Sequence, residues 1–194
     1  MQIENLHSKF DHIHRVISTD EFLNIRGLNG EIPFWISPYN PIQEVDIQKE
    51  IINLEKRLAN EGVTILSIDL FELSMDIIQR YVGVKELLAI ESKKKKDTFK
   101  RALQSTINIH ERMIPTIKAT VEEQSPRVLL LTGVGKVFPF IRSHSVLNNL
   151  QSAIKSIPTL MFFPGNYTGQ SLELFGLLKD DNYYRASNID IYKL

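Results

Sequence analysis

Short apolar runs that alternate with helical segments constrain the fold of this chain more than any other feature of its sequence. The runs are rich in β-branched and aliphatic residues, which favour strands, and they span residues 32–37, 63–69, 127–132 and 158–163. Strands that are apolar along their whole length and alternate with helices are typical of a parallel sheet covered on both faces. We therefore predict an α/β fold with three layers, α/β/α, around a mostly parallel central sheet that is Rossmann-like or similar to a degenerate P-loop domain.

The 194 residues suit a single domain spanning residues 1–194, because the chain has no internal repeat and no long linker. An amphipathic helix is predicted at the amino end, over about residues 2–18. The other predicted elements are helices over about 41–59, 71–81, 97–123, 144–156 and 170–178, a further helix that begins near Val84, and an edge strand at 183–186.

Several residues indicate where these elements begin and end. Residues 29–30, Asn-Gly, predict a turn, and Pro38 is expected to end the first strand. Asn40 is the predicted N-cap of the next helix, with Pro41 in its first turn. Pro115 is expected to kink or break the long helix in which it lies, because proline donates no backbone N–H. The inner face of the helix over 41–59 is predicted to comprise Val45, Ile51, Ile52, Leu54 and Leu58.

The composition excludes several classes of protein. No cysteine is present, which excludes a disulfide scaffold, a thiolate zinc site and a cysteine nucleophile. No apolar run approaches the roughly 18 residues that span a bilayer, and the amino end lacks the basic start and apolar stretch of a secretory signal. We therefore expect a cytoplasmic protein without membrane contact.

Charge is distributed unevenly, although the net charge is zero. Residues 1–91 carry 8 Lys or Arg against 15 Asp or Glu, and residues 92–194 carry 15 against 8. The basic half could bind phosphate or an acidic partner. Alternatively, the two halves fold together and their charges interleave.

The segment from Thr132 to Lys136 is the first candidate site. A strand followed by a glycine loop, a lysine and a helix is the order of a phosphate site, because glycines let backbone N–H groups approach an anion. A P-loop has four residues between its first Gly and the Gly-Lys pair, and a Ser or Thr after the lysine. Here one residue separates Gly133 from Gly135, and Val137 follows the lysine. We expect no ATP hydrolysis, while anion binding without hydrolysis and a tight crossover turn both remain open.

The segment around the next helix is the second candidate. Arg142 could hold a carboxylate or a phosphate in a bidentate contact, and His144 could titrate near neutral pH, although the segment could also simply order the loop and cap the helix. Open α/β sheets bind ligands at the carboxyl ends of their strands, so we predict that both segments meet there with the loop after the fourth strand. The predicted partner or anion surface comprises Gly133, Gly135, Lys136, Arg142, His144, Asn148, Asn166 and Tyr167.

Two further patterns have ordinary explanations. His7, Asp11 and His14 share one helical stripe and have the chemistry of a transition-metal site, but solvated polar residues show the same spacing, and neither a metal nor another cofactor is predicted. The run from Lys93 to Lys96 could contact nucleic acid electrostatically or form a solvated turn. No aromatic residues interleave with these lysines to stack on bases.

Three segments resemble the signature of a known family. They run from Arg127 to Gln151, from Pro158 to Gly176 and from Asn182 to Arg185. They include the sequences Leu-Leu-Leu-Thr-Gly-Val-Gly-Lys, which ends at Lys136, and Phe-Phe-Pro-Gly-Asn-Tyr, which ends at Tyr167. On these residues the chain resembles the BrxB family over its whole length. BrxB is a small core component of BREX, the bacteriophage exclusion systems of bacteria and archaea.

The resemblance implies a setting and a set of partners. BREX operons also encode the alkaline-phosphatase-like protein PglZ, a large AAA-type ATPase and an adenine-specific DNA methyltransferase. The family has no established enzymatic activity to transfer, so the resemblance implies a non-enzymatic adaptor that contacts other BREX proteins. PglZ is the expected partner, and the BREX ATPase or DNA are further expected contacts. The alternatives are a degenerate nucleotide- or phosphate-binding module and a nucleic-acid contact subunit of the same complex.

Overall fold

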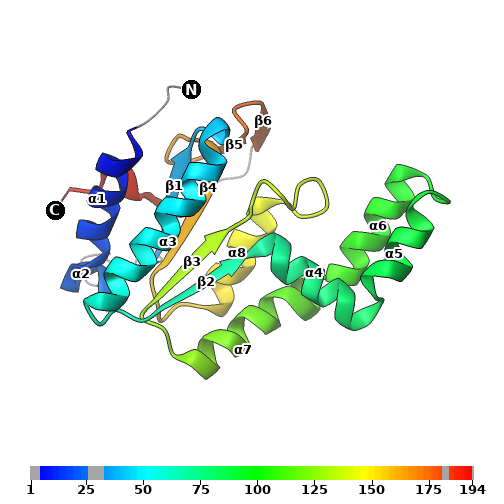
Figure 1. Cartoon of the computed structure of the whole chain (residues 1–194), viewed down its shortest axis with the longest axis horizontal. Helices are drawn as coiled ribbons and strands as arrows, with labels where there is room; N and C mark the ends of the chain where they lie inside the picture. Colours follow the sequence, from blue (N-terminus) through cyan, green and yellow to red (C-terminus); the bar gives the residue numbers. More distant parts are fainter. Residues whose placement is uncertain (1–4, 26–32, 181–183, 194) are drawn as a thin grey trace.

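A parallel sheet forms the centre of the protein (Figure 1). The structure, a computed structural model, describes residues 5–25, 33–180 and 184–193. The sheet has the strand order β2 (Ile65–Asp69), β3 (Val128–Thr132), β4 (Thr159–Tyr167), β1 (Phe34–Tyr39) and β7 (Ser187–Asn188). Every pairing along this path is parallel, and helices lie on both faces. The predicted three-layer α/β fold is confirmed.

The strand β3 is buried along its whole length. Its alternate side chains enter the two layers: Leu129 and Leu131 pack into one hydrophobic core, and Val128 and Leu130 pack into the other. A strand with two buried faces needs apolar residues at every position. This requirement explains why β3 is the clearest strand in the sequence.

The helices α1 (Leu6–Ile17) and α3 (Glu44–Asn60) cover one face of the sheet, and the short helix α2 (Asp20–Leu23) follows α1. Phe10 of α1 stacks on Phe162 of β4, with ring centroids 5.7 Å apart. Lys9 Nζ lies 2.7 Å from Asp190 Oδ2 in the carboxyl-terminal turn η3 (Ile189–Ile191), and Ser37 of β1 donates to the other oxygen of Asp190. The first helix and the carboxyl-terminal turn are therefore joined to each other and to β1.

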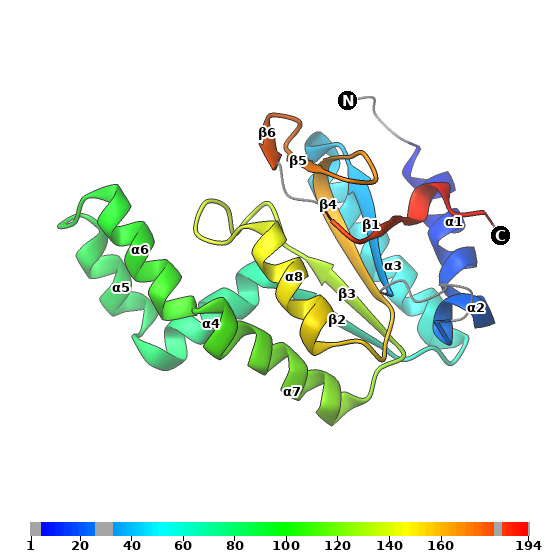
Figure 2. The ribbon, with the colours of Figure 1, turned by 180° about the vertical axis from the view of Figure 1, so that it is seen from behind.

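The opposite face is covered by α4 (Leu70–Tyr81), α7 (Ile114–Gln124) and α8 (Ser143–Ala153), as Figure 2 shows from behind. Between α4 and α7 the chain forms two further helices, α5 (Val84–Glu91) and α6 (Lys96–Ile107), which project away from the sheet. We call these two helices and the turn between them the helical arm. The lysine run forms the turn at the end of this arm.

The predicted long helix over 97–123 is broken, but not by its proline. Asn108 adopts a left-handed conformation with φ of 35° and begins a single π-helical turn, η2 (Ile109–Met113). Pro115 lies in the first turn of α7, where the missing N–H has no partner within the helix to lose. The Asn108 side chain accepts a hydrogen bond from the backbone N–H of Glu111, which stabilises the break.

The segment after β4 differs most from the sequence prediction. β4 continues through Tyr167, beyond the point where a loop is expected. The predicted helix over 170–178 is wrong, because this segment forms an antiparallel hairpin of β5 (Leu172–Leu174) and β6 (Leu178–Asp180). The end of β4 pairs with β5. A free strand edge satisfies the backbone groups of the segment better than a short isolated helix does.

Other boundaries shift by smaller amounts. The edge strand is Ser187–Asn188, rather than residues 183–186. Pro38 lies inside β1, rather than after it. The carbonyl of Pro33 accepts a hydrogen bond from the backbone N–H of Thr159 in β4. The side to which the backbone groups point alternates along a strand, so the nitrogen of Pro38 faces away from β4. It lies past the end of β7, where a missing N–H breaks no strand pairing. Asn40 caps the turn η1 (Pro41–Gln43) before α3, as predicted, whereas the turn predicted at residues 29–30 lies outside the described residues.

Ile51 and Ile52 are adjacent in α3 and both are predicted on its inner face, but only one of them is buried. Ile51 is 2% exposed, as predicted, but Ile52 is 50% exposed and Val45 is also exposed. The inward positions that the structure shows are Ile47, Ile51, Leu54 and Leu58.

We expect Ile51→Ala to lower the free energy of unfolding by about 2–5 kcal/mol, because it leaves a cavity in a packed core. Ile52→Ala should change this free energy by less than about 0.5 kcal/mol, because its side chain already contacts water. Urea denaturation of both variants checks the orientation of α3. Equal losses in the two variants would contradict it.

Candidate functional site

The carboxyl ends of β2 and β3 bring together an acidic residue and the predicted glycine loop. Gly133 directly follows β3 and has a φ of 71°, which disfavours other residues. A Cβ atom at Gly133 would lie 2.1 Å from Asp69 Oδ1 at the end of β2. Glycine is therefore required at this position for the loop to pass beside Asp69.

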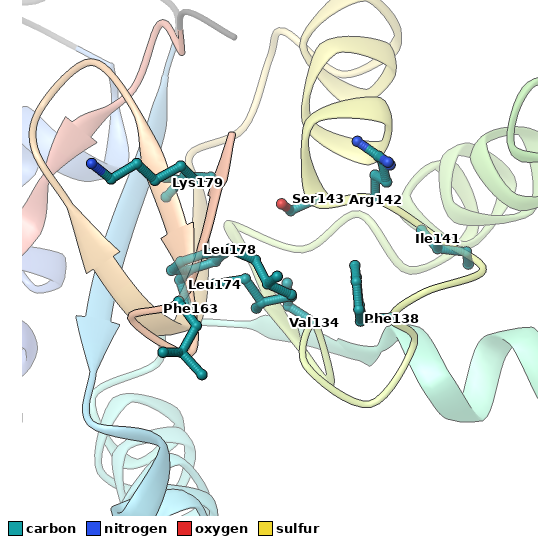
Figure 3. A pocket seen from close by; sticks show the side chains of 11 residues that line it. Val134, Phe138, Ile141, Arg142, Ser143, Phe163, Leu174, Leu178 and Lys179 are labelled. Carbon is teal, nitrogen blue, oxygen red and sulfur yellow. The ribbon is translucent and has the colours of Figure 1, made fainter. Parts of the chain in front are cut away.

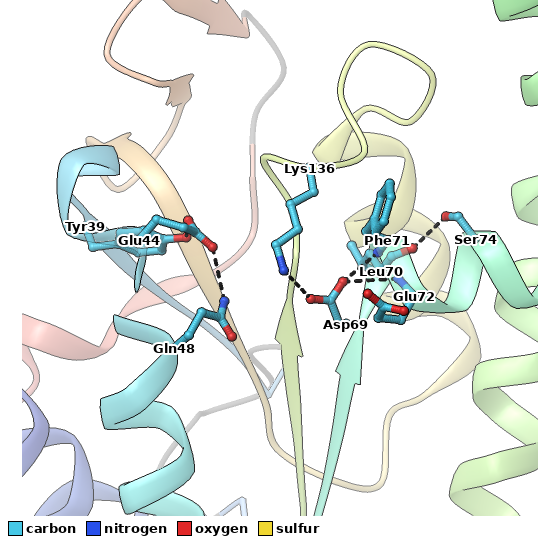
Figure 4. A network of polar contacts seen from close by, with 9 residues as sticks. All are labelled: Tyr39, Glu44, Gln48, Asp69, Leu70, Phe71, Glu72, Ser74 and Lys136. Atoms are coloured by element: carbon cyan, nitrogen blue, oxygen red, sulfur yellow. Dashed lines mark hydrogen bonds and ion pairs between the residues drawn. The ribbon is translucent and has the colours of Figure 1, made fainter. Parts of the chain in front are cut away.

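Lys136 is held by that carboxylate. Its Nζ lies 2.9 Å from Asp69 Oδ2 (Figure 4). The hydrogen bond that Lys136 donates to Asp69 raises the pKa of Lys136, and the negative charges of Asp69, Glu44 and Glu72 act in the same direction. The other oxygen of Asp69 accepts the backbone N–H groups of Phe71 and Glu72 and caps α4. Lys136 is therefore a paired cation in acidic surroundings, and an anion at this point would have to compete with Asp69.

The loop after β1 adds further polar groups to this edge. Tyr39 donates a hydrogen bond to Glu44, and Gln48 donates to the other oxygen of the same carboxylate. Burial and the hydrogen bond with Glu44 raise the pKa of Tyr39 far above its ordinary value, so the phenol remains a donor. Pro41 offers no N–H, and the N–H of Ile42 is already bonded to the Asn40 side chain. The turn therefore offers few free donors to a phosphate.

The glycine loop also packs against the hairpin. A Cβ atom at Gly135 would lie 2.9 Å from Pro164 Cγ of β4 and 3.0 Å from Phe175 Cε1 in the hairpin turn. Phe175 has a φ of 58°, which is strained for a bulky residue. Its backbone N–H is bonded to the carbonyl of Pro164 at 2.8 Å. The contact with Gly135 and this hydrogen bond hold the turn next to the loop.

The remaining predicted residues separate into two groups. Asn166 donates to Glu173 of β5, and Tyr167 is nearly buried and donates to the carbonyl of Ala186, so both hold the hairpin and the carboxyl-terminal segment in place. Arg142 and Asn148 are exposed at the start and middle of α8, and His144 is partly exposed between them. Arg142 forms no ion pair with any described residue.

An apolar recess of about 260 Å³ lies between the glycine loop, the start of α8 and the hairpin. We call it the hairpin groove (Figure 3). Buried side chains form its floor, whereas Phe138, Leu177 and Leu178 at its margin are 36%, 80% and 41% exposed. Arg142 at the start of α8 and Lys179 of β6 line it from opposite sides, and the ammonium end of Lys179 is directed away from the other labelled side chains. The lining residues are Val134, Phe138, Ile141, Arg142, Ser143, Phe163, Leu172, Leu174, Leu177, Leu178 and Lys179.

Arg142 is the single residue of the predicted partner or anion surface that lines this groove. The hairpin residues are missed because the sequence prediction treats their segment as a helix. The alternation of Leu172, Glu173 and Leu174 before Phe175-Gly176 is a strand and turn signal that could have revealed them.

The other candidate sites have structural partners. Asp11 is bonded to Arg57 at 2.7 Å, which lowers the pKa of Asp11, and His14 lies 2.9 Å from Glu61. Within the described ranges, no group of three or more His, Asp or Glu side chains is placed to hold a metal ion. No helix in the described part of the chain is both long and apolar enough to cross a membrane.

The fold and the groove define a parallel α/β domain with an exposed apolar recess at the carboxyl edge of its sheet. The family model "BREX protein BrxB" matches residues 66–189. The chain is 36% identical to the BREX protein BrxB of Bacillus cereus (strain H3081.97) over 95% of its own length and 97% of that protein. It is 27% identical to the BREX protein BrxB of Escherichia coli O9:H4 (strain HS), over 93% of its own length and 90% of that protein. No solved structure matches the chain significantly.

The chain belongs to the BrxB family, and its resemblance to that family is confirmed. It is therefore a component of a BREX phage-defence system.

Asp69 should stabilise the protein mainly as the N-cap of α4. Asp69→Ala should lower the free energy of unfolding by about 1–2 kcal/mol, because it removes the acceptor of two backbone N–H groups. Asp69→Asn keeps an acceptor and should cost less than about 1 kcal/mol, since it loses only the partly exposed ion pair with Lys136. Chemical denaturation measures both values. Asp46→Ala, which breaks an exposed pair with Lys49, serves as the control.

Proposed function

We propose that the protein is a cytoplasmic, non-enzymatic adaptor of the BREX system that docks another BREX protein in the hairpin groove. The observation that carries this proposal is the exposure of Leu177 and Leu178 beside the groove, next to a cation without a partner among the described residues. Exposed apolar patches on a folded domain mark interaction sites. Arginine beside an apolar pocket is a common centre of binding energy.

The two cations define the chemistry of the partner. Arg142 and Lys179 stand on opposite sides of the groove, and neither is ion-paired within the described residues. A segment with an apolar side chain for the groove and a carboxylate beside it would satisfy both features. We propose an acidic surface segment of PglZ as this partner, in line with the family resemblance.

A phosphate or nucleotide at the glycine loop is the weaker alternative. Lys136 is already paired with Asp69, and Glu44 and Glu72 add negative charge around it. These contacts favour a structural role for the loop, which positions Val134 and Phe138 along the groove.

The groove can be tested with the double variant Leu177→Asp and Arg142→Glu, which removes the apolar margin and reverses the charge. We expect at least about 30-fold weaker binding of PglZ, because central anchors contribute about 2 kcal/mol or more. Phage protection should be lost with it. Both side chains are exposed, so the variant should fold, and its thermal unfolding is the check.

The matched control is Ile42→Asp with Lys56→Glu, which changes an equally exposed isoleucine and a cation on the α3 side of the molecule. It should bind PglZ as the wild type does. If the groove variant still binds every BREX protein and still protects against phage, the proposed docking site is wrong.

The absence of ATP hydrolysis is a separate prediction. The purified protein should release phosphate from ATP at the background rate, because the spacing of a P-loop is lacking and Lys136 is held by Asp69. Lys136→Ala should give the same rate. Magnesium-dependent phosphate release that disappears in this variant would contradict the proposal of a non-enzymatic protein.

A further inference from the structure

Basic residues are concentrated at the end of the helical arm. We call residues 92–101 the basic tip. It contains six Lys or Arg and one acidic residue, Asp97. The lysines from Lys93 to Lys96 and Arg101 are exposed, and Lys100 is partly exposed. None of these six cations forms an ion pair with a described residue.

The arm carries this charge away from α1 and α3, which belong to the acidic half of the chain, whereas its own helix α5 and the neighbouring α4 also belong to that half. Figures 1 and 2 both show α5 and α6 at the end of the molecule opposite α1 and α2. Residues 1–91 hold an excess of seven acidic residues. Because exposed charges are screened over about 8 Å in physiological salt, the positive potential at the tip persists despite the zero net charge.

The base of the arm is firmly attached. Arg112 of η2 donates a hydrogen bond to the carbonyl of Thr106 at the end of α6. Its guanidinium lies 3.9 Å from the centroid of the Tyr81 ring at the end of α4. These contacts join α4, α6 and η2, so the tip is presented by an ordered support rather than by a loose loop.

The composition of the tip decides between two kinds of partner. Protein interfaces are depleted of lysine and centre on apolar side chains, whereas protein–nucleic acid interfaces are strongly positive and polar. Residues 91–98 are all exposed and include no apolar side chain. The tip therefore has the character of a nucleic-acid contact. It offers no exposed aromatic ring for stacking on unpaired bases, which favours a duplex.

We propose that the basic tip binds the phosphate backbone of a nucleic-acid duplex without reading its sequence. Lysine ammonium groups act as point charges and neutralise phosphates individually. The tip shares no residue with the hairpin groove. The two contacts therefore use different residues, and this inference does not depend on the proposed docking site.

The test measures binding of the full chain to fluorescent duplexes of about 20 base pairs, one of DNA and one of RNA, at about 50 to 200 mM salt. The logarithm of the association constant should fall linearly with the logarithm of the salt concentration, with a slope between about −3 and −5, because each neutralised phosphate contributes about −0.9. Binding of one duplex only would identify the natural ligand as DNA or RNA.

The variant with serine in place of Lys93, Lys94, Lys95 and Lys96 should bind at least tenfold more weakly, and its slope should be smaller in magnitude by about 3 to 4. Arginine at the same four positions should retain binding, since the charge is kept. The matched control has serine in place of four exposed lysines elsewhere, namely Lys49, Lys56, Lys155 and Lys193. It has the same net charge as the tip variant but should bind as the wild type does.

Three results would overturn the proposal. One is the absence of binding to either duplex at the lowest salt concentration. Another is an equal loss of binding in the control variant, which would indicate that the net charge of the protein, rather than the lysines of the tip, determines binding. The third is binding to poly-glutamate without binding to either duplex, which would identify an acidic protein as the ligand.

Discussion

Burial of a parallel sheet on both faces is the constraint on which the rest of this structure depends. The inner strands β3, β4 and β1 bury both of their faces, so the connections between strands must supply covering helices, whereas the edge strand β2 is only partly covered. The connection from β1 to β2 supplies α3 on one face, and the connections from β2 to β3 and from β3 to β4 supply α4, α7 and α8 on the other. The path from β2 to β3 is much longer than one covering helix requires, and the excess forms the helical arm.

The same arrangement places the carboxyl ends of β1, β2, β3 and β4 at one edge of the sheet. The charged side chains at this edge fall into two regions. Asp69 neutralises Lys136 and caps α4, and Glu44 is occupied by Tyr39 and Gln48. This side of the edge is polar and internally satisfied. On the other side, the hairpin and the start of α8 leave leucines exposed and Arg142 unpaired among the described residues. The contrast explains why we assign docking to the hairpin groove rather than to the glycine loop.

The two proposed contacts use different physical forces. The hairpin groove offers apolar area with two cations beside it, so it selects a partner by shape and by a few placed charges. The basic tip offers charge almost alone, so its binding is general and sensitive to salt. A phage-defence component with both surfaces could bring a protein partner to nucleic acid, with the arm separating the two contacts.

The sequence by itself determined the layers of the fold, the central strand β3 and the loop at its end. These follow from local rules: continuous apolar runs form buried strands, Asn40 and Pro41 begin a helix, and Gly133 permits a tight turn. The tertiary structure decided where the hairpin docks, because β5 pairs with the extended end of β4, although the alternation of Leu172, Glu173 and Leu174 already signals a strand. It also decided that Asp69 takes the charge of Lys136, since these residues are distant in the chain and meet only when β2 and β3 pair. The buried Ile51 and the exposed Ile52 differ in a way that periodicity does contain, because Ile47, Ile51, Leu54 and Leu58 form one i, i+4, i+7, i+11 stripe that excludes Ile52.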